Sequence, residues 1–141
     1  MIASLDASAR NGGIVALQGQ AEGEAAIGAV LKDPGGSLLH QISARIGWAP
    51  DHHVAEYQAL IAGLRLARGH GVDRIRVFLD SAVVVNQVNG DWKVKEEHFK
   101  PLVREAHTLV REFTDIQISL VGRKGNAEAH TLADKALAPI R

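Results

Sequence analysis

The chain has 141 residues, 46% of them apolar, which fits a single globular domain spanning residues 1–141. It contains no cysteine, so disulfides, thiolate zinc sites and cysteine nucleophiles are excluded. Sixteen basic and sixteen acidic residues give a formal net charge of zero, which argues against a strongly basic nucleic-acid binder. The first twenty residues hold charged side chains and no long apolar run, so we expect a cytoplasmic protein without a secretory signal or membrane helix.

The first half of the chain predicts a strand, a turn and a hairpin. Ile2–Leu5 is predicted as a short buried strand that Asp6 closes. Residues 11–24 carry four glycines and are predicted as a turn or flexible hairpin. The Asp-Pro-Gly-Gly sequence at 33–36 is a strong turn signal, so the segments on its two sides should pair as antiparallel strands. These two strands are predicted at residues 25–31 and 38–46.

The second half of the chain predicts alternating helices and strands. Val54–Arg68 has apolar residues at helical spacing, and Glu56 borders its buried stripe. Ile75–Leu79 is predicted as a strand, which Asp80 closes. Three further helices are predicted: 83–89 with Ser81 as N-cap, 101–113 with Pro101 in its first turn, and 127–138 with Asn126 as N-cap. A last strand is predicted at 116–121. This order predicts an α/β fold with a mixed sheet.

Three carboxylates lie at element ends or on a buried stripe, where an unneutralised charge costs several kcal/mol. They are Asp6, Glu56 and Asp80. A divalent metal ion is the simplest cation that could hold all three together. The three carboxylates therefore predict a nuclease or phosphoryl-transfer site.

Several stretches of the sequence resemble type 1 ribonuclease H, in the compact form common in archaea and many bacteria and akin to the domain of retroviral reverse transcriptases. They are Leu5-Asp6-Ala7-Ser8 and residues 26–33, 54–64, 79–81, 85–95, 126–129 and 132–133, and together they span nearly the whole chain. The Ala-Glu-Tyr sequence and the Asn-Gln-Val-Asn-Gly-Asp-Trp-Lys-Val-Lys sequence are specific in combination. The resemblance implies a five-stranded mixed sheet, with the first three strands antiparallel and the others parallel, and helices on both faces.

The resemblance also implies the chemistry. Acidic residues of the family come from the first strand, the first long helix, the fourth strand and the last helix. They bind two Mg²⁺ or Mn²⁺ ions and hydrolyse the RNA strand of RNA–DNA hybrids, leaving 5′-phosphate and 3′-hydroxyl ends. Here Asp6 would bridge both ions, and Glu56 and Asp80 would each bind one. The fourth acidic position, counted from Asn126, is His130.

The fourth position leaves three alternatives open. His130 could ligate the second metal, which would favour Mn²⁺ over Mg²⁺. Asp134, one helical turn later, is a less favoured substitute. The third alternative is that His130 is an ordinary polar helix residue and the site uses three carboxylates.

The resemblance further implies contacts to the hybrid. In the family, the residues just before the position of Glu56 contact the backbone and bases of the hybrid, and this chain has Asp51-His52-His53 there. Two interpretations are equally compatible with the sequence: His52 and His53 contact the hybrid, or they are an adventitious surface pair. Trp92 is either a contact or a core residue, and Arg123 either meets the scissile phosphate or lies in a solvated loop. The predicted substrate contacts are Arg10, Asn11, His52, His53, Trp92, Lys93, Lys95 and Arg123.

Three functions are compatible with these features. The first is a metal-dependent endoribonuclease that acts as a monomer on RNA–DNA hybrids. The second is a catalytically weak or inactive module that binds hybrids or double-stranded RNA, which His130 and the altered sequence at 51–53 favour. The third is a nuclease of the same fold with another substrate. The acidic cluster favours catalysis, because it would repel the phosphates of a ligand that is only bound.

Overall fold

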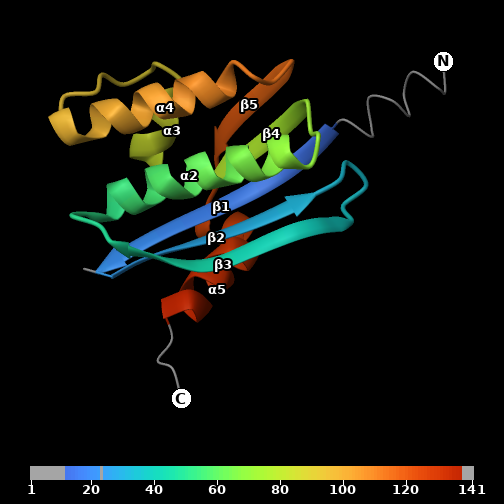
Figure 1. Ribbon diagram of the computed structural model, residues 1–141, viewed down its shortest axis with the longest axis horizontal. Coiled ribbons are helices and arrows are strands. Elements are labelled where there is room, and N and C mark those ends of the chain that lie inside the picture. Colours follow the sequence, from blue (N-terminus) through green and yellow to red (C-terminus); the bar gives the residue numbers. More distant parts are fainter. Residues whose placement is uncertain (1–11, 23, 138–141) are drawn as a thin grey trace.

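The computed structural model describes residues 12–22 and 24–137, and its centre is a five-stranded sheet (Figure 1). The strands are β1 (Gly12–Glu22), β2 (Glu24–Lys32), β3 (Leu38–Trp48), β4 (Arg74–Leu79) and β5 (Asp115–Leu120), in the order β3-β2-β1-β4-β5. The first three strands pair antiparallel, β4 runs parallel to β1, and β5 runs parallel to β4. The predicted mixed sheet is confirmed.

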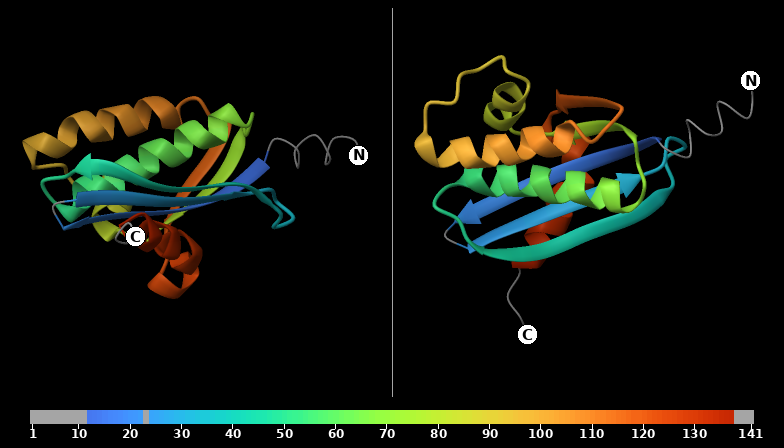
Figure 2. Two further views of the ribbon diagram at one scale, coloured as in Figure 1. Left: turned by 60° about the horizontal axis from the view of Figure 1, so that its bottom comes forward. Right: turned by 45° about the horizontal axis from the view of Figure 1, so that its top comes forward.

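Helices cover both faces of this sheet, as expected (Figure 2). The elements are α2 (His52–Gly69), α3 (Ala82–Val88), α4 (Lys100–Val110) and α5 (Ala127–Leu137), with the short 3₁₀ helices η1 (Glu97–Phe99) and η2 (Arg123–Asn126). The long helices α2 and α4 lie side by side on one face, and α5 lies on the other. None of the helices in residues 12–22 and 24–137 has the length and apolar content that a bilayer crossing requires.

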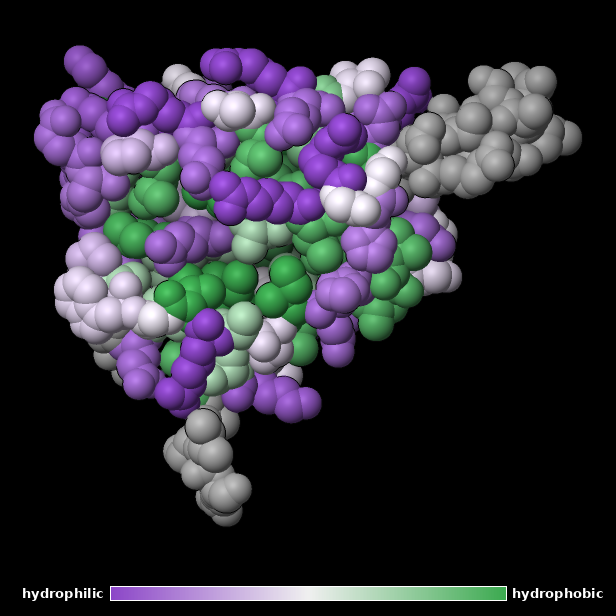
Figure 3. Space-filling view, viewed as in Figure 1, coloured by the Kyte–Doolittle hydropathy of each residue, from purple (hydrophilic) through white to green (hydrophobic). Residues whose placement is uncertain are grey.

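The hydrophobic core lies between the sheet and the α2–α4 layer. Strand residues alternate, and Val15, Leu17, Val77 and Leu79 are fully buried. A strip of partly buried apolar side chains from α2 and β3 extends this core toward the surface, and green atoms cross the middle of the face in Figure 3. The sheet edge at β3 is therefore less completely covered than its centre.

The residues of β1 correct one prediction. Residues 11–24 were predicted as a turn or flexible hairpin, but residues 12–22 form the central strand of the sheet, and the connection to β2 lies only between Glu22 and Glu24. Its buried positions alternate from Gly13 through Val15 and Leu17 to Gly19. The predicted strand Ile2–Leu5 lies outside the described residues, and the first strand that the structure describes is β1.

Helix α5 packs against β2 with almost no side chain between them. A Cβ atom added to Gly28 would lie 1.9 Å from the carbonyl oxygen of Ala129. Two side chains of β3 also reach the helix: Ser43 Oγ donates to the carbonyl of Leu132 at 2.6 Å, and Arg45 Nε donates to that of Ala136 at 2.9 Å. Glycine at position 28 thus sets how closely the last helix approaches the sheet.

Strand β3 ends in a bulge. Ala25 of β2 pairs with Gly47 and Ala26 with Arg45, so Ile46 is an extra residue in β3. Gly47 has φ of 96°, a left-handed conformation that glycine adopts without strain. The next residue, Trp48, is 71% exposed. The bulge therefore turns a large aromatic side chain toward solvent just before α2 begins.

Candidate functional site

Four elements meet at one corner of the sheet: β1, α2, β4 and α5. The parallel register pairs Leu17 of β1 with Leu79 of β4. A Cβ atom added to Gly19 would lie 2.2 Å from the carbonyl oxygen of Ala55 in α2 and 2.4 Å from the next backbone nitrogen. The side-chain amide of Asn126, just before α5, donates to the carbonyl oxygen of Leu17 at 2.6 Å. Residues 17–19 of β1 are thus the point at which the other three elements converge.

Glu56 lies in the first turns of α2 and is only 2% exposed. Its Oε1 is 3.0 Å from Nδ1 of His53, and its Oε2 is 3.4 Å from Nε2 of His52. Burial raises the pKa of Glu56, and the two histidines and a hydrogen bond from Ser81 partly offset that rise. Both carboxylate oxygens are therefore engaged by imidazoles of the same helix.

Asp80 follows β4 directly and is partly buried, as expected from the sequence. The next residue, Ser81, caps α3 by accepting the N–H of Val84 at 3.3 Å. Because Ser81 also hydrogen-bonds Glu56, the carboxylates of Glu56 and Asp80 belong to the same corner. Their roles as metal ligands stay a prediction.

The β1 residue at this corner is Gln18. The last pair of these two parallel strands is Leu17 with Leu79, so Gln18 and Asp80 each lie one residue beyond it. On its other side Gln18 pairs with Gly28 of β2. Asp6, the predicted first ligand, lies outside the described residues, as do the predicted contacts Arg10 and Asn11. The residue at this position of the first described strand is thus a glutamine, where an acidic residue was expected.

Helix α5 carries His130 one residue after Ala129, whose carbonyl oxygen meets Gly28, the β2 partner of Gln18. His130 is mostly buried, with 21% of its side chain exposed, and its Nε2 is 3.5 Å from Oδ2 of Asp134. The two alternatives for the fourth ligand therefore lie together, one turn apart on α5. Either role stays a prediction.

The residues that these four elements carry in this region are Gln18, Glu56, Asp80 and His130: two carboxylates, an amide and an imidazole. Two divalent ions bring four positive charges, of which Glu56 and Asp80 balance two; Asp134 in the fourth position would balance only a third charge, and charge count sets the affinity of such oxygen sites. Among the described residues, no three His, Asp or Glu side chains are placed to ligate one metal ion. The described ligand set does not fit a pair of divalent ions.

The segment before Glu56 is built into α2 rather than left as a loop. Asp51 caps the helix by accepting the N–H of Val54 at 3.0 Å, and its other oxygen lies 2.9 Å from Nε2 of His98. Burial raises the pKa of Asp51, but the bonds from His98 and Val54 outweigh it and leave that pKa below its usual value. Both carboxylate oxygens of Asp51 are thus paired with groups of the protein itself, whereas His52 remains half exposed.

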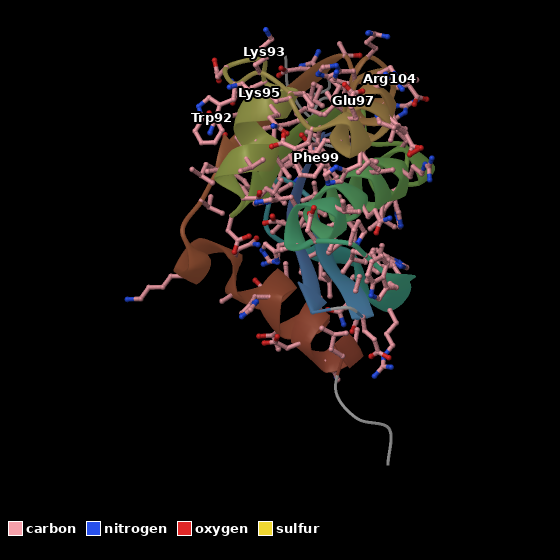
Figure 4. The ribbon with its side chains drawn as sticks, turned by 90° about the vertical axis from the view of Figure 1, so that its left-hand side faces the viewer. Trp92, Lys93, Lys95, Glu97, Phe99 and Arg104 are labelled. Atoms are coloured by element: carbon pink, nitrogen blue, oxygen red, sulfur yellow. The ribbon has the colours of Figure 1, made fainter. Side chains whose placement is uncertain are left out.

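The predicted DNA-side contacts lie on the loop between α3 and α4. Figure 4 shows Trp92, Lys93 and Lys95 grouped on this loop, with Phe99 directed inward below them. Trp92 is 48% exposed, which excludes its assignment to the core, and both lysines are exposed. Arg123 begins η2 on the way into α5.

Sequence reasoning missed the roles of three residues: Gln18 in β1, Ser81 as a partner of Glu56, and His98 as a partner of Asp51. The signal for Gln18 was present, because the family pattern places a glycine after its first acidic residue. Ala7 follows Asp6, whereas Gly19 follows Gln18. Nothing in the sequence signals the pairing of His98 with Asp51 across 47 residues.

A family model described as reverse transcriptase-like matches residues 14–136. The match begins after Asp6 and includes Gln18. A bifunctional protein of Mycobacterium tuberculosis is 38% identical over 116 residues, which are 82% of this chain and 32% of that protein. Ribonuclease HI of Halobacterium salinarum is 36% identical over 115 residues, covering 82% of this chain and 57% of the relative. The chain thus spans about a third of the length of the mycobacterial protein and somewhat over half the length of the Halobacterium enzyme.

Solved structures agree with the sequence matches. The N-terminal ribonuclease H domain of the mycobacterial protein has a TM-score of 0.85 at 34% identity, covering 90% of this chain and 99% of that one. Ribonuclease H1 of Halobacterium salinarum has a TM-score of 0.86 at 32% identity, with 89% and 97% covered. LC11 ribonuclease H1, in complex with an RNA/DNA hybrid, has a TM-score of 0.81 at 32% identity, with 88% and 95% covered.

Proposed function

Because this chain belongs to the reverse transcriptase-like family, and within it to the type 1 ribonucleases H, we propose that it recognises RNA–DNA hybrids. We also propose that its hydrolysis of the RNA strand is far slower than that of a site with four carboxylates. The observation that carries this proposal is the corner itself: β1, α2, β4 and α5 are all in place, but two of the four positions that the family fills with acidic residues hold Gln18 and His130.

The surface around the corner supports hybrid binding. Lys93 and Lys95 are exposed on the α3–α4 loop and can each neutralise a phosphate of the DNA strand. Trp92 beside them offers an aromatic face to a sugar or base. Because Asp51 is paired with His98, it repels a phosphate less than its charge suggested, and His52 can donate to a 2′-hydroxyl.

Full ribonuclease H activity is the second candidate function. The retention of Glu56 and Asp80 at one corner favours it, since a module that only binds gains nothing from two carboxylates facing phosphates. In this candidate Mg²⁺ or Mn²⁺ ions support hydrolysis to 5′-phosphate and 3′-hydroxyl ends. It requires a further acidic ligand, for which Asp6 is the sequence-based prediction.

One assay separates these functions. The protein and an Asp80→Asn variant are incubated with end-labelled RNA–DNA hybrid, double-stranded RNA and single-stranded RNA, with Mg²⁺ or Mn²⁺. Tight binding of the hybrid, with cleavage absent or slow and unchanged in the variant, supports the proposal. Rapid cleavage of the hybrid that Asp80→Asn abolishes supports the second candidate. Binding no tighter for the hybrid than for single-stranded RNA contradicts both.

A further inference from the structure

Gln18 occupies a position defined by backbone geometry alone. It lies one residue beyond the Leu17–Leu79 pair, as Asp80 does on β4, and one residue before Gly19, which touches the backbone of Ala55 and Glu56. Gln18 thus stands in β1 between the residue that pairs with the end of β4 and the residue that touches the start of α2. Whatever residue stands at position 18 therefore completes, or fails to complete, the corner that Glu56 and Asp80 begin.

The chemical difference between glutamine and aspartate at this position is one negative charge. A carboxylate there would raise the corner's formal charge from two to three negative charges and could bridge two ions, whereas an amide oxygen is a neutral ligand. Glu56 cannot compensate readily, because His52 and His53 lie within 3.4 Å and 3.0 Å of its two oxygens. Any cation entering the corner has to compete with those two imidazoles for the same carboxylate.

We propose that Gln18 is the residue that keeps this corner from binding divalent cations tightly, so that the native domain holds a hybrid without loading metal. This inference rests on the proposed function and deepens it. It predicts that the remainder of the metal site persists, because Glu56 and Asp80 are in place, and that one substitution in β1 is enough to recover affinity.

The test is a titration with Mn²⁺ in the absence of nucleic acid. Binding is measured by isothermal titration calorimetry and by the change in melting temperature. Gln18→Asp should bind Mn²⁺ at least about tenfold more tightly than the native protein, and its melting temperature should rise with added Mn²⁺. Gln18→Asn, which shortens the side chain as aspartate does without adding charge, should behave like the native protein. Gln117→Asp makes the same change at an exposed position of β5 opposite Arg76 and should also gain nothing.

The double variant Gln18→Asp/Asp80→Asn should lose the affinity that Gln18→Asp gains. If Gln18→Asp lowers stability, the titration still decides, because a metal that binds only the folded state restores the melting temperature. The inference is overturned if the native protein binds Mn²⁺ as tightly as Gln18→Asp, or if Gln18→Asp gains nothing. Hybrid affinity measured in EDTA tests the proposed function separately, since it requires no metal.

Discussion

The contact between Gly28 and α5 makes a quantitative prediction for Gly28→Ala. The new Cβ would lie 1.9 Å from the oxygen of Ala129 and 2.8 Å from the nitrogen of Ala133, whereas ordinary contacts begin near 3.4 Å. Both atoms are backbone, so no rotamer change relieves the clash, and strand and helix must separate by more than an ångström. Overpacking costs about 1–3 kcal/mol, and a backbone clash belongs at the upper end, about 3 kcal/mol.

Alanine recovers less than about 1 kcal/mol of this through the lower entropy of the unfolded chain. For a domain of this size each kcal/mol shifts the melting temperature by roughly 2–4 °C, so a net loss of about 2–3 kcal/mol lowers it by roughly 4–12 °C. Thermal melts followed by far-ultraviolet circular dichroism measure the change.

The matched control is Gly122→Ala. No atom lies within 4 Å of a Cβ added there, and φ is −73°, which alanine adopts freely. Its stability should stay within about 0.5 kcal/mol of the native value. If Gly28→Ala melts as close to the native protein as Gly122→Ala does, α5 does not rest on β2 in the way described.

Three further predictions concern single groups. Burial raises the pKa of Glu56 above its ordinary 4.5, so the folded state binds the proton more tightly and stability falls as pH rises through the folded pKa. Glu56→Gln removes that loss and should raise the melting temperature more at pH 8 than at pH 5; the reverse order would contradict the pKa shift. Tyr57 donates to Oε1 of buried Gln87 at 2.5 Å, so Tyr57→Phe strands an acceptor and should cost about 1–3 kcal/mol in urea denaturation, a cost absent in a Gln87→Met background. Replacing Lys93 and Lys95 by alanine should reduce the slope of log affinity against log salt by about 2 for a labelled hybrid in fluorescence anisotropy, and an unchanged slope would show that neither lysine meets a phosphate.

Most of the fold could be predicted from local patterns. The helix that carries Glu56 was predicted as Val54–Arg68 and spans His52–Gly69, and the strand before Asp80 differs from its prediction by one residue. Ser81 was predicted as an N-cap and accepts the expected backbone N–H. These elements follow from periodicity and capping chemistry, which act over a few residues.

The first strand could not be predicted in this way, because its glycines have a tertiary cause. A Cβ atom added to Gly13 would lie 3.0 Å from Cγ1 of Val72, and Gly19 is required by α2; a single sequence does not distinguish such glycines from those of a turn. Ile2–Leu5 followed by Asp6 and residues 14–17 followed by Gln18 are also similar patterns. The acidic residue drew the prediction to the first of them, although the following glycine favours the second.

The two tryptophans have a practical consequence for experiments on this protein. Trp48 and Trp92 are the only two in the chain, and both indoles meet water in the native fold. The tryptophan fluorescence of the native protein should therefore already have its maximum at long wavelength, and unfolding will shift that maximum little. The same property makes each indole a fluorescent reporter of its own part of the surface. In Trp92→Phe the remaining tryptophan, Trp48, reports on the end of β3, and in Trp48→Phe the remaining Trp92 reports on the α3–α4 loop. Quenching by an added nucleic acid would then reveal which of the two it touches.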